Sequence, residues 1–457
     1  MGRTWVSMNP RKFAKVQGKL PGPKASAVVK STAKYVSPSI SRFYPLVVES
    51  AHGSLVKDVD GNQFIDFAAG IAVLSTGSTH PKVVEAVKRQ AEKFIHFSYT
   101  DFYYDNLIRL SERLLPLVPG DGKKMVYYGN SGAEAIEAAM KLTRNHTKRP
   151  LFLAHSGAFH GRTMGALSLT ASKPMQRKGA LPLIPDVVHF PYPYCYRCPW
   201  KQTFPECDYY CVDYFKDQYL DKFVPVGDVA SYFFEPIQGE GGYVPAPPEY
   251  FNKMEFLRKE GVLFVCDEIQ TGVGRTGKFL GIEDYGIVPD VVTIAKGIAS
   301  GLPLSATIAK AEIMESWKPG QHASTFGANP VAVEAALATL DVIESEKLLE
   351  NARRLGDKAK KRFLEMKAKY EIVGDVRGKG LFVGIEIVKD KKTKTRGDEE
   401  AARIVDYCFH HGVLVIFAGH NTLRFIPPLN VTEGVMDEGI DIMEEGIAVV
   451  NSATTKV

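Results

Sequence analysis

The fold of this chain is decided by the stretch VLFVCDEIQ at residues 262–270, together with PDVVTIAKG at residues 289–297. Each is a short, continuous apolar run that ends in polar residues, which is typical of a strand buried on both faces of a parallel sheet. In an open parallel sheet, ligands bind beyond the carboxyl ends of the strands. We therefore expect Asp267 and Lys296 to stand at neighbouring strand ends and to face one crevice.

Four further apolar runs repeat this pattern between residues 80 and 330. Helical segments separate them, and the runs are Lys124–Tyr128, Leu151–Ala154, Val187–Phe190 and Val229–Phe234. Strands that alternate with helices through short connections indicate a mostly parallel sheet covered on both faces. Ahead of this region, two alternating runs within residues 55–67 flank the turn Asp60-Gly61-Asn62 and predict a β-hairpin.

The rest of the chain predicts a smaller α/β domain. Residues 336–370 form one long helical stretch in this interpretation, and strands follow at 381–387, 413–417 and 422–426. Helices are expected at 400–411 and from Thr432 onward. The length of 457 residues fits two or three domains, because a single hydrophobic core rarely grows so large.

Composition narrows the class of protein. Hydrophobic residues make up 45% and charged residues 24%, as in ordinary soluble globular proteins. The net charge of +5 is not concentrated in a dense basic block, so we expect no nucleic-acid partner. No apolar run approaches the roughly 18 residues that span a bilayer, so we expect no membrane partner either. The basic N-terminal segment lacks the apolar core of a secretory signal, which predicts a cytoplasmic location.

The chemistry of Lys296 and Asp267 suits a cofactor that carries an aldehyde and a pyridine ring. A lysine amine forms an imine with an aldehyde. A carboxylate beside a pyridine nitrogen keeps that nitrogen protonated, so that the ring accepts electrons. The alternative is a structural salt bridge at a domain edge, which is common in proteins.

Two glycine-containing loops add candidate binding residues. YGNSGAEAIE at 128–137 joins a strand to a helix, and free amides at a helix start bind anions, although Asn130 or Ser131 serving as a plain N-cap would explain the same pattern. GAFHGRT at 157–163 offers Phe159 for stacking on a flat ring and Arg162 for gripping a carboxylate. A core phenylalanine and a surface arginine would explain this second loop equally well.

Three more segments contain polar residues in unusual settings. FEPIQGEGG at 234–242 places Glu235 and Glu240 in a glycine-rich passage, where the alternative is a tight turn with solvated side chains. HASTFGANP at 322–330 is a polar loop that leads into a helix, and an ordinary connecting loop would look the same. Arg424 interrupts an apolar strand, so it needs a partner if buried, or else points to solvent from an edge strand.

Together these motifs resemble the class III (ω-) aminotransferases among the fold-type I pyridoxal-phosphate (PLP) enzymes, over residues 40–445. The segments at 59–72 and 267–277 are especially similar to the 4-aminobutyrate and ornithine aminotransferase branch. The resemblance implies an α/β fold: a large domain with a mostly parallel seven-stranded sheet, plus a smaller α/β domain. It also implies a division into an N-terminal arm (1–40), the N-terminal part of the small domain (41–75), the large PLP-binding domain (76–335) and the C-terminal small domain (336–457).

The resemblance further implies roles for the cofactor-binding residues. Lys296 would carry PLP as a Schiff base and move the reacting proton, and Asp267 would pair with the ring nitrogen. Gln270 would lie near the phenolic oxygen, and Phe159 would stack on the ring. Ser131, Gly132 and Ala133 would hold the phosphate, joined by Thr325 from a partner subunit. That last role implies a homodimer or larger assembly with shared active sites.

By the same resemblance, Arg162 grips the distal carboxylate, Arg424 grips the α-carboxylate of glutamate or 2-oxoglutarate, and Glu240 pairs with Arg424 while an ω-amine reacts. Phe43 stands where the ornithine enzymes have a tyrosine, and it cannot hydrogen-bond an α-amino group. Glu235 would contact the residues that bind the cofactor and substrate, without binding either itself.

The expected activity is transfer of the ω-amino group of ornithine, 4-aminobutyrate or a related amine to 2-oxoglutarate, giving glutamate. The first alternative is a PLP-dependent amino-acid racemase or epimerase on the same fold. A second alternative, a zinc-stabilised binding protein with a basic surface, leaves Asp267 and Lys296 unexplained.

Four of the six cysteines form the separate pattern Cys195-x2-Cys198-x8-Cys207-x3-Cys211. This spacing suits a zinc site, two disulfides, or free thiols in an ordered loop, and the sequence does not choose among them. We therefore assign no metal site.

Overall fold

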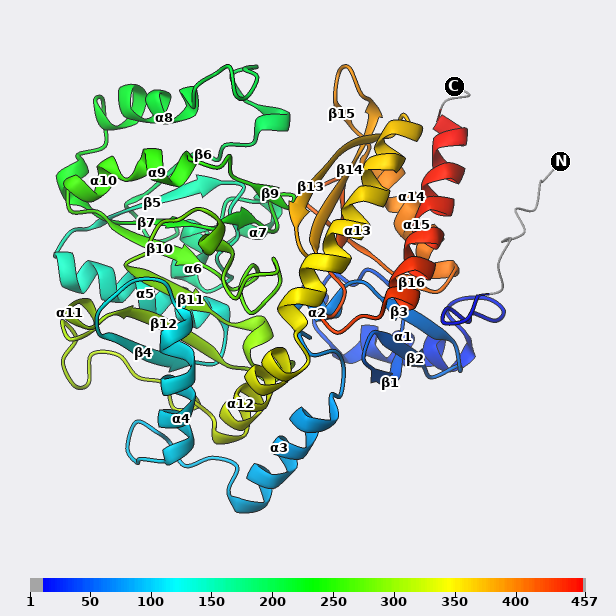
Figure 1. The fold of residues 1–457 in the computed structure, drawn as a ribbon, viewed down its shortest axis with the longest axis horizontal. Helices are drawn as coiled ribbons and strands as arrows, with labels where there is room; N and C mark the ends of the chain where they lie inside the picture. Colours follow the sequence, from blue (N-terminus) through cyan, green and yellow to red (C-terminus); the bar gives the residue numbers. More distant parts are fainter. Residues whose placement is uncertain (1–10, 455–457) are drawn as a thin grey trace.

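The computed structural model describes residues 11–454 of the chain. Its centre is a seven-stranded sheet with the order β4-β12-β11-β10-β7-β5-β6. The strands are β4 (Lys124–Gly129), β5 (Leu151–Ser156), β6 (Val187–Pro191), β7 (Val229–Phe234), β10 (Leu263–Asp267), β11 (Val291–Ile294) and β12 (Ser305–Lys310). Figure 1 shows this sheet on the left of the view and the smaller sheets on the right.

The central sheet is mostly parallel, as the sequence and the resemblance predict. The strands β11, β10, β7, β5 and β6 run parallel to their neighbours. Only β12 is antiparallel, both to β11 and to β4. All six apolar runs identified in the sequence form strands. The seventh strand, β12, has no continuous apolar run because Ser305 and Thr307 interrupt it, although both side chains are buried.

Both faces of the sheet are covered, which explains why its strands are apolar throughout. In β7, Phe233 belongs to the core under helix α5 (Gly132–Thr147), with Ile136 and Ala139. Its neighbours Tyr232 and Phe234 point the other way, into the core that contains α12 (Pro330–Ser345). On that second side, α12 packs against α3 (Pro81–Lys93) and α4 (Asp105–Leu114).

Two smaller sheets lie beside the central sheet, and one of them combines strands from both ends of the chain. One contains β13 (Val373–Lys379), β14 (Phe382–Asp390), β15 (Thr395–Arg396), β17 (Ile416–Ala418) and β18 (Thr422–Phe425). The other contains the predicted hairpin, β2 (Leu55–Asp58) and β3 (Gln63–Asp66), with β1 (Val48–His52) and β16 (Val413–Leu414). Helices α13 (Leu348–Lys369), α14 (Asp398–His410) and α15 (Glu433–Thr454) accompany these sheets (Figure 1).

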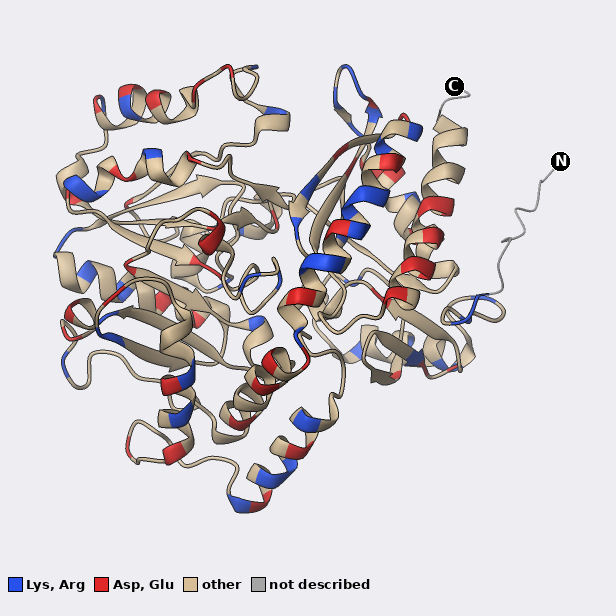
Figure 2. Cartoon of the chain, viewed as in Figure 1, with Lys and Arg blue, Asp and Glu red and all other residues tan. Residues whose placement is uncertain are grey.

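Short elements complete the description. The helices are α1 (Pro23–Tyr35), α2 (Ala69–Ala72), α6 (Met164–Leu169), α7 (Pro174–Arg177), α8 (Tyr210–Phe215), α9 (Tyr250–Met254), α10 (Phe256–Lys259) and α11 (Ala311–Met314). The strands are β8 (Ile237–Gln238) and β9 (Val244–Pro245). Within residues 11–454, no helix is long and apolar enough to cross a membrane. Figure 2 shows basic and acidic residues interspersed along α3, α4 and α13.

The structure differs from the sequence interpretation in two elements of the C-terminal part. The strand expected at 413–417 is two short strands, β16 and β17, which belong to different sheets. The stretch 336–370 is not one helix, because α12 ends at Ser345 and α13 begins at Leu348. The chain turns at Lys347, whose φ of +52° is left-handed. The domain boundaries stay a prediction, and α12 runs without a break through the expected boundary after residue 335. Residues 1–10 of the expected arm lie outside the described residues.

Candidate active site

Lys296 and Asp267 lie at the carboxyl ends of two adjoining parallel strands. In the ladder between β10 and β11, Asp267 is opposite Thr293, three residues before Lys296. Lys296 has a left-handed φ of +43°, a conformation that costs a non-glycine residue about 1–3 kcal/mol. Burial lowers the pKa of the Lys296 amine to about 8, although the negative charge of Asp267 acts to raise it. Within residues 11–454, this amine forms no hydrogen bond or ion pair.

Asp267 is buried and held by two hydrogen bonds. Its Oδ2 is 2.7 Å from Nδ1 of His160, and its Oδ1 accepts from the backbone amide of Ile269 at 3.0 Å. Burial by itself lowers the pKa of His160, but the hydrogen bond and charge of Asp267 outweigh it and raise that pKa. The two contacts keep the Asp267 carboxylate in a fixed orientation near Lys296.

Glu235 connects the two loops that flank this pair. Its Oε1 accepts from the amide of Phe159 at 3.1 Å, and its Oε2 accepts from the amide of Gly239 at 2.8 Å. Burial raises the pKa of Glu235 to about 7. One carboxylate thereby fixes both the loop that carries Phe159 and the loop that carries Glu240.

The start of α5 provides a site for an anion. Ser131 is the N-cap, because its Oγ accepts from the amide of Glu134 at 3.3 Å, while the amide of Ser131 donates to Glu134 Oε2 at 2.9 Å. The simple capping interpretation is therefore correct for this serine. The cap leaves the amides of Gly132 and Ala133 unused. These amides have no partner inside the helix because they lie in its first turn. Amides of this kind bind phosphate groups.

The loop at 157–163 packs directly against this helix start. At Gly161, whose φ is +145°, a Cβ atom would lie 2.8 Å from the Cβ of Ala133. The close approach brings Phe159, which is half-buried, next to the anion site. Arg162 is exposed, and its guanidinium lies 5.5 Å from the centre of the Phe159 ring.

The segment that contains Thr325 lies beside the same helix start. The side-chain amide of Asn130 donates to Ser324 Oγ at 3.2 Å. Thr325 itself is exposed. Among the residues that the structure describes, neither Thr325 nor Phe43 has a hydrogen bond, ion pair or ring contact with another predicted site residue. Phe43 packs instead on Phe417, with ring centres 5.0 Å apart.

Glu240 and Arg424 form an ion pair on the other side of the site. Arg424 is 4% exposed, so the edge-strand interpretation is wrong for this residue. The guanidinium lies 5.6 Å from the ring centre of Tyr243, whose hydroxyl donates to Gln270 Oε1 at 3.0 Å. A second cation, Lys173, contacts the other carboxylate oxygen of Glu240, with Nζ 2.8 Å from Oε1.

Sequence reasoning missed three residues of this arrangement. His160 lies within the quoted loop GAFHGRT, and its signal was a histidine between an aromatic residue and a glycine. Tyr243 follows the quoted glycine-rich passage directly. Lys173 lies in a loop with no motif around it, so nothing in the sequence marked it.

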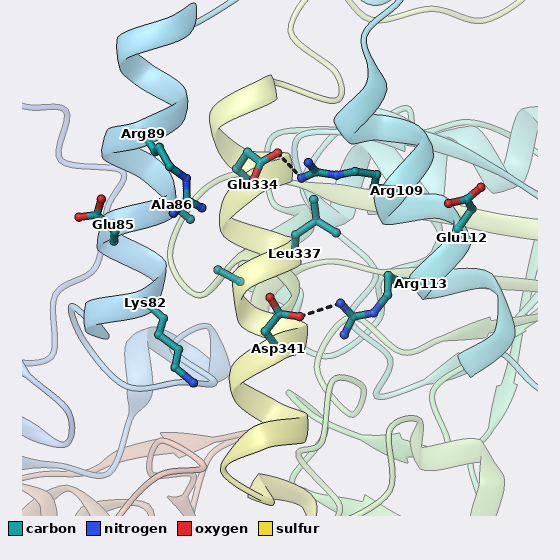
Figure 3. Close-up of a pocket in the computed structure, with 11 residues that line it drawn as sticks. Lys82, Glu85, Ala86, Arg89, Arg109, Glu112, Arg113, Glu334, Leu337 and Asp341 are labelled. Carbon is teal, nitrogen blue, oxygen red and sulfur yellow. Dashed lines mark hydrogen bonds and ion pairs between the residues drawn. The ribbon is translucent and has the colours of Figure 1, made fainter.

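A surface pocket between α3, α4 and α12 is separate from this site. Figure 3 shows that its lining mixes basic and acidic side chains, and four of them form two ion pairs: Arg109 with Glu334 at 2.6 Å and Arg113 with Asp341 at 2.7 Å. None of the predicted site residues lines it. Its lining contains as many acidic as basic side chains.

The four clustered cysteines line one small apolar cavity, with Trp200 and Tyr210 among its walls. They are free thiols in this structure. Burial raises the pKa of Cys195 to about 11 and that of Cys211 to about 12, so both are protonated at neutral pH. Within residues 11–454, no group of three or more His, Cys, Asp or Glu side chains is arranged to hold a metal ion.

Comparison with known proteins gives consistent matches over nearly the whole chain. The family model for class-III aminotransferases matches residues 35–447. The leucine/methionine racemase of Thermococcus litoralis is 40% identical over 416 residues, which are 90% of this chain and 93% of that protein. The isoleucine 2-epimerase of Lentilactobacillus buchneri is 39% identical over 437 residues (95% and 97%). A probable 4-aminobutyrate aminotransferase of Bacillus subtilis is 37% identical over 417 residues (91% and 95%).

Solved structures agree with these matches. An aminotransferase of Bacillus anthracis superposes with a TM-score of 0.86 at 30% identity and covers 93% of this chain and 99% of its own. The ornithine aminotransferase of Toxoplasma gondii, with PLP at partial occupancy in its active site, superposes with a TM-score of 0.83 at 28% identity. That match covers 94% of this chain and 96% of the other.

Proposed function

Because the chain belongs to the class III aminotransferases, which are PLP-dependent enzymes, we propose that it moves the ω-amino group of ornithine, 4-aminobutyrate or a related amine to 2-oxoglutarate, giving glutamate. The observation that carries this proposal is the buried ion pair of Glu240 with Arg424. A transaminase accepts two unlike substrates in one site, and this pair offers a way to serve both.

The residues present fit PLP, whose groups are an aldehyde, a pyridine ring and a phosphate. Lys296 offers an unpaired amine for the aldehyde, and Asp267 offers a buried carboxylate for the ring nitrogen. The amides of Gly132 and Ala133, with Ser131, suit the phosphate. Phe159 and Gln270 are proposed to border the ring face and its phenolic oxygen. When bound, PLP supplies a ring that withdraws electrons from the reacting carbon of the substrate.

We assign the proton transfer to Lys296. A pKa of about 8 leaves a useful fraction of the amine neutral near neutral pH. The neutral amine would take the proton from the substrate carbon that bears the nitrogen and hold it for the carbon on the other side of that nitrogen, which the cofactor would supply. Asp267 would keep the ring nitrogen protonated when the cofactor is bound, and His160 keeps the Asp267 carboxylate oriented.

Arg424 serves the α-carboxylate of 2-oxoglutarate or glutamate in this proposal. A buried guanidinium without a partner is costly, so it must be neutralised in both halves of the reaction. Glu240 neutralises it while an ω-amine donor reacts, and the α-carboxylate does so when 2-oxoglutarate is bound. Arg162, exposed beside Phe159, is proposed to bind the distal carboxylate. Phe43 is proposed to border the donor pocket.

An amino-acid racemase or epimerase is the second candidate, and the relatives favour it. Proteins named as an isoleucine 2-epimerase and a leucine/methionine racemase match this chain at 39% and 40% identity. Such an enzyme uses a single substrate with an α-carboxylate and needs no second carboxylate partner for Arg424. The ion pair with Glu240 is the reason that we place transamination first.

One pair of assays tests the proposal. The PLP-loaded enzyme is incubated with 2-oxoglutarate and a panel that includes ornithine, lysine and 4-aminobutyrate, and glutamate formation is measured. In parallel, single L-amino acids are incubated without a keto acid, and the D-form is measured by chiral chromatography. Glutamate formation with little D-amino acid is the expected result. Rapid racemisation with no glutamate from any donor overturns the proposal in favour of the racemase.

We also propose a homodimer, or a larger assembly, whose subunits share active sites. Large apolar side chains are exposed close together along the chain at Ile95, Phe97 and Phe102, and Phe326 is exposed next to Thr325. Exposed apolar clusters of this kind mark interaction surfaces. A partner subunit covering Phe326 brings its own Thr325 toward the phosphate site. Light scattering in solution measures the assembly, and a monomer at micromolar concentration contradicts it.

A further inference from the structure

We propose that Lys173 is a specificity-determining residue that holds Glu240 after the carboxylate of 2-oxoglutarate has displaced it from Arg424. This inference rests on the proposed function, because only an enzyme with two unlike substrates needs Glu240 to move. Lys173 therefore acts through Glu240 and need not touch the substrate.

The two cations use different oxygens of one carboxylate. Lys173 Nζ lies 2.8 Å from Oε1 of Glu240, whereas Arg424 binds Oε2. Breaking the contact with Arg424 thus leaves the contact with Lys173 in place. The side chains are 26% exposed for Lys173, 16% for Glu240 and 5% for Arg424, so this small network runs from the site toward solvent.

Lys173 is held in position by the loop that carries Phe159. Ala171, two residues before it, donates its amide to the carbonyl of Ala158 at 2.8 Å and accepts from the amide of Gly157 at 3.0 Å. Thr170 Oγ1 accepts from the amide of His160 at 2.9 Å. The backbone of Glu240 is fixed too, because its carbonyl accepts from the amide of Gly419 at 2.7 Å. Only the side chains therefore need to move.

Electrostatics explain why a second cation matters. Burial alone raises the pKa of Glu240, but the charges of Arg424 and Lys173 outweigh it and lower that pKa. If Arg424 were the only cation, displacing Glu240 would leave a half-buried carboxylate without a partner, and such groups are costly. Lys173 removes that cost, so the displacement by the substrate carboxylate becomes easier.

Lys296, Tyr243 and His420 are further titratable groups close to this network. His420 lies on the side of Lys173. Its pKa is lowered, first by burial and then by the positive charge of Arg396, so at neutral pH it is largely uncharged. Among the residues that the structure describes, Lys173 and Arg424 are the two cations that form ion pairs with Glu240. Lys173 is therefore the group that can keep Glu240 ionised away from Arg424.

The test uses glutarate, a dicarboxylate that cannot react, and calorimetric titration of the PLP-loaded enzyme. Lys173→Met should weaken glutarate binding about tenfold, within the usual range of coupling between two sites. Lys173→Arg should restore most of the binding. Lys178→Met removes an exposed lysine at the other end of α7 and should change nothing. In turnover, the KM for 2-oxoglutarate should rise with Lys173→Met, while the rate of the donor half-reaction changes less than about twofold.

A double-mutant cycle separates action through Glu240 from direct attraction of the ligand. In a Glu240→Gln background, Lys173→Met should have no effect on glutarate binding, because no carboxylate remains to be held. A tenfold loss in that background shows direct attraction and overturns the role. Unchanged binding in Lys173→Met alone overturns it as well. If the unaltered enzyme binds no dicarboxylate at all, the transaminase proposal fails and takes this inference with it.

Discussion

His160 lies 2.7 Å from Asp267, with its Nδ1 facing Oδ2 of the carboxylate. Against the effect of burial, Asp267 raises the pKa of His160, which favours the protonated ring, and in that form Nδ1 donates to the carboxylate. The pair is buried, and His160 Nε2 has no hydrogen-bond partner within the described residues. This contact orients the acidic group that faces the ring nitrogen in the proposed function.

Replacing His160 by Phe should weaken the enzyme's hold on PLP. A hydrogen bond to a charged group contributes about 1.5–3 kcal/mol, so we expect the Kd for PLP to rise about tenfold to a hundredfold. Fluorescence titration of the PLP-free protein measures it. His146→Gln changes an exposed histidine on α5 and serves as the control. An unaltered Kd in His160→Phe would show that Asp267 is oriented without it.

Lys296→Ala should abolish turnover. The substitution removes both the amine that attaches to the cofactor and the base that moves the proton, so no residual route remains in the described site. The visible absorbance of the lysine-bound cofactor should vanish, while PLP still binds through Asp267 and the start of α5. Absorbance spectra and glutamate formation are measured together. Normal turnover in this variant would refute the assignment of Lys296.

The positions of Asp267 and Lys296 could be predicted because a buried strand leaves a strong pattern. Each residue follows a continuous apolar run, and parallel strands in an open sheet end at the same edge. β12 left no such pattern, since Ser305 and Thr307 are polar yet buried. The break between α12 and α13 could not be predicted either, because Lys347 adopts a left-handed φ and no glycine or proline marks the turn.

The contacts of the loop residues could not be predicted, because the path of a loop decides where its side chains point. His160 and Phe159 are neighbours in sequence, yet His160 is buried against Asp267 and Phe159 is half-buried beside Arg162. Lys173 reaches Glu240 only because residues 157–158 and 171 pair through their backbones. Such contacts depend on tertiary structure, which short-range sequence patterns do not report.

Gly161→Ala should disturb the proposed phosphate site. The added methyl group would lie 2.8 Å from Cβ atoms of both Ala133 and Ala166, so the loop must move away from α5. We expect a loss of about 1–3 kcal/mol in the free energy of unfolding, together with weaker PLP binding. Gly179→Ala is a matched control, because Gly179 also has a positive φ but no atom within 4 Å of the added group. Equal losses in both variants would mean that backbone strain alone is responsible.

The buried carboxylate of Glu268 should make stability depend on pH. Burial raises its pKa to about 7, although Thr271 and the amides of Gly281 and Ile282 donate to it. The folded state therefore binds a proton that the unfolded state releases, so this group's contribution is full below the unfolded pKa and is lost as pH rises toward 7.

Glu268→Gln should remove that dependence. Relative to the variant, the unaltered protein should lose up to about 3 kcal/mol of stability between pH 4.5 and pH 7.5. Urea unfolding at several pH values measures the difference, and Glu312→Gln, at an exposed position, is the control. A constant difference between the two proteins across this range would contradict the raised pKa.

If the subunits share active sites, mixing two inactive or weakened variants, Thr325→Ala and Lys296→Ala, should restore activity. If Thr325 acts on the phosphate bound by the partner subunit, each site combines Lys296 of one subunit with the partner's Thr325. Thr325→Ala should then weaken PLP binding about tenfold through the loss of a hydrogen bond to a charged group.

In a mixed dimer of Thr325→Ala with Lys296→Ala, one site carries both defects and the other carries none. Random mixing of subunits should restore about a quarter of the unaltered activity at limiting PLP. The control is the double variant, which carries Lys296→Ala and Thr325→Ala in one chain. It should stay inactive. No recovery on mixing, despite exchange of subunits shown by light scattering or affinity tags, would mean that Thr325 serves its own subunit or none.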